Sequence, residues 1–259
     1  MANYYFLATL LPRLQIGEPP EISFDEFDQL LSDNLSASDY AKTSTIRNFY
    51  DIYNLRSYWK GEPLDHAGNF NSSELEEAMV TRTMLPPYVF QFLDKYESKE
   101  ERLRHFPELL STFYKIEVSR STGFLKAYLM LERELRLVLV AFRTKKLDRD
   151  LLKELQYEDP EEEIIAQIIA QKDASQYEPP PKFEEIKFIF EKYSNDPIEI
   201  QKALAEFRFY KIEEMLGLDM FSIDRILGYM AQLLIVERWQ HLNKQKGKEI
   251  VDSMLKDIS

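Results

Sequence analysis

Apolar residues in most of this chain recur every three or four positions, which is the spacing of one face of an α-helix. The clearest run covers about five helical turns in the middle of the chain. Its large side chains are separated by alternating steps of four and three: Phe124, Tyr128, Leu131, Leu135, Val138 and Phe142. Ile164, Ile165, Ile168 and Ile169 predict a shorter amphipathic helix.

Capping residues predict where other helices begin and end. Helix starts are indicated by Ser-x-x-Glu capping boxes and by residue pairs with proline in the first turn. These signals are Ser23 with Glu26, Ser73 with Glu76, Pro86-Pro87 and Asp196-Pro197. Gly61 and Gly217 are natural residues to follow the last turn of a helix. A long helix is predicted from about Ser222 past Val236, followed by a separate one carrying Ile250, Val251, Met254 and Leu255.

Period-two alternation, the pattern of a half-buried strand, is almost absent. Only Tyr4 to Leu11 is compatible with a strand. The pattern therefore predicts an all-α fold of roughly ten to twelve helices, as expected from the caps and breaks. Three consecutive prolines in the segment 177–182 predict a stiff extended connector. We expect lobes at residues 1–85, 86–176 and 183–259, with this connector at 177–182.

One helical segment is written more than once along the chain. DIYNLRSYWKG, from Asp51 to Gly61, and ERWQHLNKQKG, from Glu237 to Gly247, both open with an acid and close with Lys-Gly at the same spacing. A looser relative runs from Phe124 to Leu147. Repeated segments of this kind indicate one helical unit used several times.

Composition and charge exclude several classes of function for this chain. Hydrophobic residues make up 44% of the 259 residues, which is enough for a sizeable core. The formal net charge of -12 argues against a nucleic-acid partner, which requires clustered cationic residues. The chain has no cysteine, so disulfides, thiolate catalysis and cysteine-ligated metals are excluded. The start of the chain lacks the features of a signal peptide, and its longest apolar run, 226–236, is far shorter than the ~20 residues of a spanning helix. We expect a soluble cytoplasmic protein.

Candidate chemistry is sparse. Two histidines follow a glutamate by four residues, Glu101 with His105 and Glu237 with His241, a spacing that can place both side chains on one helix face. The paired Glu-x-x-His pattern of a di-iron bundle is missing, and so are phosphate loops and nucleophile motifs. No catalytic centre, metal or cofactor is predicted, and a carboxylate-metal enzyme is kept only as a third alternative.

Charged residues interrupt the apolar helix in the middle of the chain. Glu134 and Arg136 have two interpretations: a solvated edge, or a junction that faces neighbouring helices or a partner. Buried charge is costly unless it is paired, so the second interpretation marks a specific contact.

The opening segment, NYYFLATLLPRLQIGEPPEISFDEF, resembles the start of a bacterial family of uncharacterised proteins encoded among V-type ATPase genes in Chlamydiae and Bacteroidetes. The helical segments are also similar to those of the funnel-shaped central-stalk subunit of A/V-type ATPases, which has an equivalent in the eukaryotic enzyme. IRNFYDIYNLRSYWKG supplies the Asn-Leu-Arg of that family, and ILGYMAQLLIVERWQHLNKQKG has its Tyr, Glu and Lys-Gly in order.

The resemblance implies a three-lobed helical subunit that joins the rotor shaft to the membrane ring of proteolipid subunits in an ion-translocating complex. Such a protein is not an enzyme, and it is peripheral to the inner membrane through its protein partners. The residues expected at partner-binding or inter-lobe contacts are Asp51, Asn54, Arg56, Glu134, Arg136 and Glu237. The alternative is a free-standing assembly or regulatory protein of the ATPase.

Overall fold

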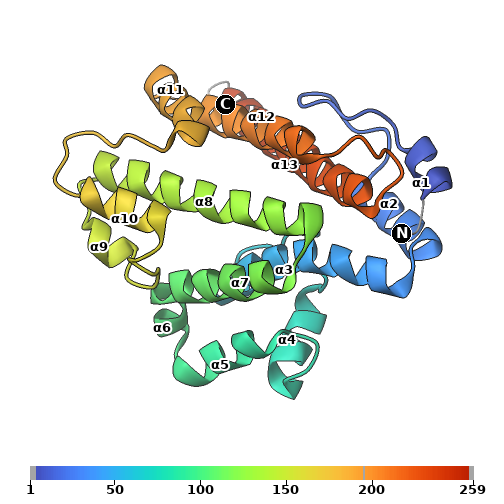
Figure 1. The fold of residues 1–259 in the computed structure, drawn as a ribbon, viewed down its shortest axis with the longest axis horizontal. Helices are drawn as coiled ribbons and strands as arrows, with labels where there is room; N and C mark the ends of the chain where they lie inside the picture. The colour runs from blue at the N-terminus through green and yellow to red at the C-terminus, as the bar shows by residue number, and fades with distance from the viewer. Residues whose placement is uncertain (1–3, 195, 257–259) are drawn as a thin grey trace. The chain divides into compact units, whose positions relative to one another are not determined.

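The computed structural model describes residues 4–194 and 196–256, and in them every regular element is a helix (Figure 1). The chain forms two compact units. The first contains Met1–Thr43 and Ile189–Ser259, and the second contains Ser44–Phe188. Two helices, α3 (Ala37–Lys60) and α11 (Glu184–Lys192), cross from one unit to the other along the chain.

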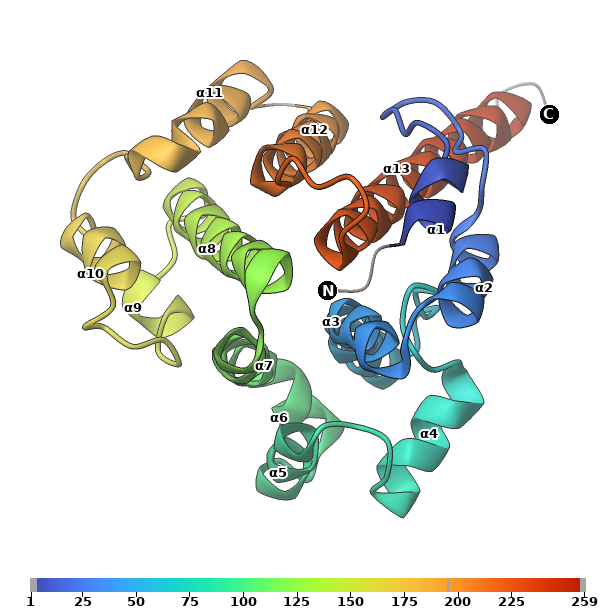
Figure 2. The same ribbon diagram turned by 45° about the vertical axis from the view of Figure 1, so that its right-hand side comes forward.

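The first unit is built on two long helices that run side by side, α12 (Pro197–Met215) and α13 (Ile223–Lys256) (Figure 2). The shorter helices α1 (Tyr5–Leu10) and α2 (Phe24–Asn34) pack on each other, and α2 also packs on α13. The ring of Phe27 lies 5.2 Å from that of Tyr229, which joins α2 to α13 in the core.

The second unit is organised around α7 (Phe106–Arg120) and α8 (Gly123–Lys146), which pack together. Aromatic contacts join α3 to α7, with the ring centroids of Tyr53 and Phe106 5.6 Å apart. Helices α5 (Pro87–Lys95) and α6 (Lys99–Arg104) pack on α7, whereas α9 (Leu151–Glu154) and α10 (Glu163–Ala170) pack on α8. The remaining elements are α4 (Ser72–Thr81) and the 3-10 helix η1 (Pro181–Phe183).

The predicted all-α fold is confirmed, with thirteen α-helices in the described residues. The prediction that Tyr4–Leu11 could form a strand is wrong, because residues 5–10 form α1, with Leu7 as its buried residue. A strand needs a partner to satisfy its backbone. The described part of the chain contains no second strand.

Several helix boundaries were predicted correctly. Ser23 and Glu26 form the expected capping box at α2. Gly61 has φ +73°, and the backbone bonds Gly61 N–H to Tyr58 C=O and Glu62 N–H to Ser57 C=O make a Schellman motif that ends α3. The Asp196-Pro197 pair caps α12 as predicted.

Two boundaries differ from the prediction. The capping box of α4 is Asn71 with Glu74, two residues before Ser73 and Glu76. Asparagine is as good an N-cap as serine, so the longer helix is favoured. The prediction of a separate final helix was also wrong, because α13 continues through Gly247 to Lys256. A single glycine weakens a helix without necessarily ending it.

The three lobes expected from the sequence divide the chain differently from the two compact units. Of the predicted extended connector 177–182, residues 177–180 are non-helical, whereas Pro181 and Lys182 belong to the 3-10 helix η1. Within the described residues, no helix is both long enough and apolar enough to cross a membrane.

Candidate functional site

Asp51 and Asn54, the first two of the expected contact residues, are buried on α3 and hold the loop that follows this helix. The Asp51 carboxylate accepts hydrogen bonds from the main-chain N–H and the side-chain amide of Asn69, at 2.7 and 2.6 Å. Asn54 exchanges two hydrogen bonds with the main chain of Asp65, at 2.8 and 2.7 Å. Both side chains are therefore committed to the fold of the second unit.

Gly68 fits into this network because it has no side chain. A Cβ atom there would lie 2.6 Å from both Asp51 Oδ1 and Asn54 Nδ2, closer than any normal contact. Its carbonyl oxygen accepts from Nε and Nη2 of Arg47, at 3.2 and 2.6 Å. The loop thus lies directly against the polar face of α3.

Burial raises the pKa of Asp51 to about 6, and the hydrogen bonds from Asn69 only partly oppose this shift. Because the folded state holds this proton more tightly than the unfolded chain, the group's stabilising contribution is complete below its ordinary value of 3.8. The contribution is lost as the pH rises through about 6.

We therefore expect the wild-type protein to gain roughly 1 kcal/mol of unfolding free energy relative to Asp51→Asn between pH 7 and pH 5. Urea unfolding of both proteins at the two pH values measures this difference. The same stability gap at both values would contradict the raised pKa.

Arg56 lies on the same helix but has a different environment. Its guanidinium carbon lies 5.5 Å from the centre of the Phe106 ring, and the residue is half-buried. Asn54 and Leu55 are buried, so Arg56 is the member of the Asn-Leu-Arg segment best suited to a partner.

Arg136 belongs to a buried charge cluster of the second unit. Glu158 is 3% exposed and binds both Arg136 and Arg133, the latter at 3.0 Å. Arg133 also pairs with Glu162 at 2.6 Å. Burial acts to raise the pKa of Glu158, but the two arginines outweigh it, and the pKa lies below its ordinary value. The cluster joins α8 to the segment between α9 and α10.

Glu134 is not part of that cluster. It pairs with Lys182, whose side chain is largely exposed. Glu134 and Arg136 therefore have separate partners within the second unit, although they are two residues apart on α8. The junction hypothesis for these two residues stays a prediction.

Glu237 accepts a hydrogen bond from the main-chain N–H of Phe24 at 2.8 Å, so it caps the start of α2 from α13. The two copies of the repeated segment thus use their opening acids differently, since Asp51 holds a loop and Glu237 caps a helix. The closing glycines also differ, because Gly61 ends α3 whereas Gly247 lies inside α13.

The two glutamate–histidine pairs are engaged in ordinary structural contacts. Glu101 forms the capping box of α6 with Ser98, and His105 stacks on Tyr96 and makes a 2.5 Å hydrogen bond with Tyr157. Nδ1 of His241 lies 3.1 Å from the main-chain oxygen of Glu237. In the described residues no three acidic or histidine side chains gather where they could hold a metal ion.

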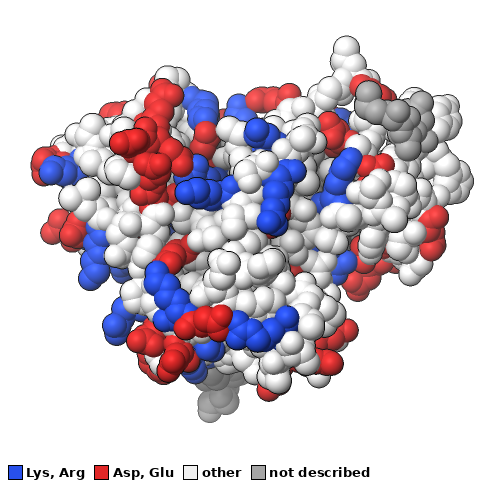
Figure 3. Space-filling view, turned by 60° about the horizontal axis from the view of Figure 1, so that its bottom comes forward, with Lys and Arg blue, Asp and Glu red and all other residues white. Residues whose placement is uncertain are grey.

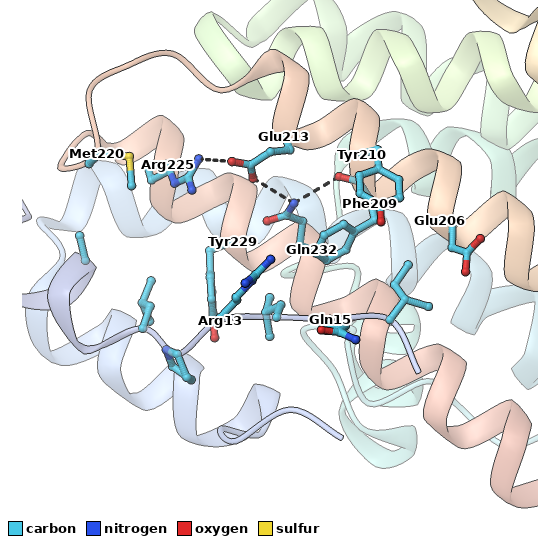
Figure 4. A pocket seen from close by; sticks show the side chains of 15 residues that line it. Arg13, Gln15, Glu206, Phe209, Tyr210, Glu213, Met220, Arg225, Tyr229 and Gln232 are labelled. Carbon is cyan, nitrogen blue, oxygen red and sulfur yellow. Dashed lines mark hydrogen bonds and ion pairs between the residues drawn. The ribbon is translucent and has the colours of Figure 1, made fainter. Parts of the chain in front are cut away.

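A groove in the first unit was not identified from the sequence. It has a volume of about 840 Å³ and lies between the segment 11–16 and the helices α12 and α13 (Figure 4). We call the segment 11–16 the strap. Arg13 of the strap and Tyr229 of α13 both line the groove (Figure 4). The sequence of this region, LPRLQIGEPP, contains three prolines and a glycine, which indicate a non-helical segment. Only the fold places this segment against α12 and α13.

Polar side chains of α12 and α13 form a fixed wall in this groove. Glu213 pairs with Arg225 at 2.9 Å and accepts from Gln232 at 3.3 Å, and Gln232 also donates to the Phe209 carbonyl at 3.2 Å (Figure 4). Gln232 is 5% exposed, so this wall is part of the packed unit.

The charged side chains visible on one face of the molecule are mixed in sign. Figure 3 shows acidic and basic groups interspersed on that face, with uncharged surface between them. A phosphate backbone is bound by clustered cationic residues, which this face does not present in its described part.

The described residues define an all-helical protein. Most of the charged residues singled out from its sequence make hydrogen bonds or ion pairs within the fold. The chain belongs to the family described as "Protein of unknown function (DUF2764)", whose model matches residues 1–258. Uncharacterized proteins of Chlamydia muridarum and Chlamydia trachomatis are each 30% identical over 264 aligned residues, covering 100% of this chain and 99% of theirs. One from Chlamydia pneumoniae is 28% identical over the same length.

The expected membership of an uncharacterised bacterial family is thus confirmed, with relatives in Chlamydia. No solved structure matches this chain significantly. The names of the relatives do not mention an ATPase, so that association is a proposal.

Proposed function

We propose that this protein is a non-catalytic component of a V-type ATPase that acts as a central-stalk subunit and couples the rotor shaft to the membrane proteolipid ring. It would be a cytoplasmic protein, peripheral to the inner membrane through these partners. The support is the similarity of its helical segments to those of the funnel-shaped stalk subunit, together with the opening segment typical of a family encoded among ATPase genes.

The observation that carries the proposal is the construction of the Asp51-to-Gly61 segment. Leu55 is fully buried, Asp51 and Asn54 clamp the following loop, and Gly61 ends the helix. The segment that resembles the stalk subunit is therefore a rigid unit of α3, a helix of 24 residues.

Rigidity suits a coupling function. A subunit that transmits torque must keep its helices fixed while its partners turn, and buried polar clamps resist local unfolding. The cluster of Arg133, Arg136 and Glu158 supplies a second clamp, on α8. Among the expected contact residues, the half-buried Arg56 and Glu134 remain the best placed to meet a partner.

We expect the tagged protein, isolated from mildly solubilised membranes of its native host, to carry the ATPase subunits with it at about one copy per complex. Quantitative mass spectrometry measures this ratio. A tagged, equally abundant helical protein of the same host is the control. We expect Arg56→Ala to lower the recovery of the ATPase with only a small fall in melting temperature, because the contact of Arg56 with the Phe106 ring is lost.

Two other outcomes are informative. Recovery with only a minor, partly assembled fraction of the ATPase would replace the proposal by the assembly-protein alternative. Failure to recover ATPase subunits above the control would refute both forms of the association.

A further inference from the structure

We propose that the groove beneath the strap binds an extended peptide segment of a partner protein, one that carries a carboxylate among apolar side chains. This inference rests on the groove alone and is independent of any association with an ATPase.

The strap has unused main-chain hydrogen-bonding capacity. Residues 11–15 are neither helical nor paired as a strand, and the main-chain N–H groups of Arg13 and Leu14 donate to no main-chain carbonyl of another described residue. Leu14 is buried and anchors the strap to the unit. An extended peptide lying alongside can hydrogen-bond to such a segment, as in recognition by strand addition.

Arg13 supplies the charge preference. The side chain of Arg13 is exposed, and it forms no ion pair with an acidic side chain of the described residues. Two acidic side chains line the groove: Glu213 is already bound to Arg225 and Gln232, and Glu206 lies away from Arg13 in Figure 4. An incoming carboxylate would therefore find a guanidinium free to bind it with two parallel hydrogen bonds.

The walls of the groove supply apolar contact. Tyr210 and Met220 line it and are 64% and 50% exposed, respectively. Phe209 and Tyr229 add aromatic surface. Apolar side chains on both sides of the carboxylate would cover these residues and remove them from water.

The shape favours a peptide over a small anion. The groove follows the strap from Leu11 to Ile16, and both residues line it. A small anion would satisfy Arg13 but would leave the strap's main-chain groups and the exposed Tyr210 and Met220 unused. A peptide engages all three features at once.

The test uses the full chain and a displayed library of short random peptides. Enriched peptides are synthesised, and their Kd is measured by fluorescence anisotropy. We expect them to share an acidic residue flanked by apolar residues, and we expect Arg13→Ala to weaken their binding at least about tenfold. Replacing the peptide's acid by its amide should weaken binding to the wild type similarly, with little further loss on Arg13→Ala.

Matched variants control for folding and for general charge. Arg238→Ala removes another exposed arginine of the first unit, outside the groove lining, and should bind the peptides like the wild type. Tyr210→Ser should weaken binding while leaving the melting temperature nearly unchanged.

Three results would overturn the inference: no enrichment of peptides, enriched peptides without an acid, or equal affinity of Arg13→Ala and the wild type. Binding of indole-3-acetate, a small aromatic carboxylate, as tightly as the enriched peptides would also overturn it, because the groove would then be a site for small anions.

Discussion

Replacing Glu158 by alanine is expected to destabilise the second unit by about 3–5 kcal/mol, because it leaves Arg133 and Arg136 without their shared buried partner. Glu158 is the most deeply buried member of the cluster, and the Nε atoms of both arginines already have no hydrogen-bond partner. Without the two carboxylate oxygens of Glu158, more N–H groups of these arginines would lack a hydrogen-bond partner. Thermal and urea unfolding of the variant measure the loss.

Glu134→Ala is the matched control, since it removes an acid of α8, the helix that carries Arg133 and Arg136, and the partner of that acid, Lys182, is 55% exposed. Its cost should be within about 1 kcal/mol, as for other surface ion pairs. The double variant Arg136→Met/Glu158→Leu should lose less stability than the two single changes added together, because Arg136 is removed together with its partner and Arg133 keeps Glu162. Equal stability of Glu158→Ala and Glu134→Ala would show that the cluster is solvated.

Leu135→Ala should cost about 2–5 kcal/mol by leaving a cavity in the core around α8. The residue has no exposed surface and lies in the apolar stripe that runs along this helix. The lost free energy combines the burial of the removed methyl groups with the lost contacts of their neighbours. Urea unfolding gives the value directly.

Met130→Ala tests whether the effect comes from burial or from helix propensity. Met130 lies on the same helix but is 42% exposed, and alanine is a strong helix former. Its unfolding free energy should change by less than about 0.5 kcal/mol. Comparable losses for the two variants would contradict the position of Leu135 in the core.

The helical fold was predictable because its signals are local. The stripe from Phe124 to Phe142 lies on α8, and the capping box of Ser23 lies at the start of α2, where the sequence predicted them. Errors arose where two local signals competed. Asn71 and Ser73 are both good caps, and Gly247 weakens a helix that nevertheless continues.

The environments of the expected contact residues were harder to predict, because a charged side chain can lie either at the surface or in a buried ion pair. Arg136 and Glu134 differ by two positions, yet one is held in a buried cluster and the other pairs with an exposed lysine. Their partners lie 22 and 48 positions further along the chain. The sequence does not specify which distant residues meet.

The sequence by itself determined the all-helical fold, the main helix boundaries and membership of the family, because spacing, capping and similarity are properties of neighbouring residues or of the chain as a whole. Only the tertiary structure decided that Asp51 and Asn54 clamp a loop, that Glu237 caps α2 and that Arg13 enters a groove. Each of these depends on a side chain meeting a main chain or a surface outside its own element, and that contact is set by how the chain packs in three dimensions.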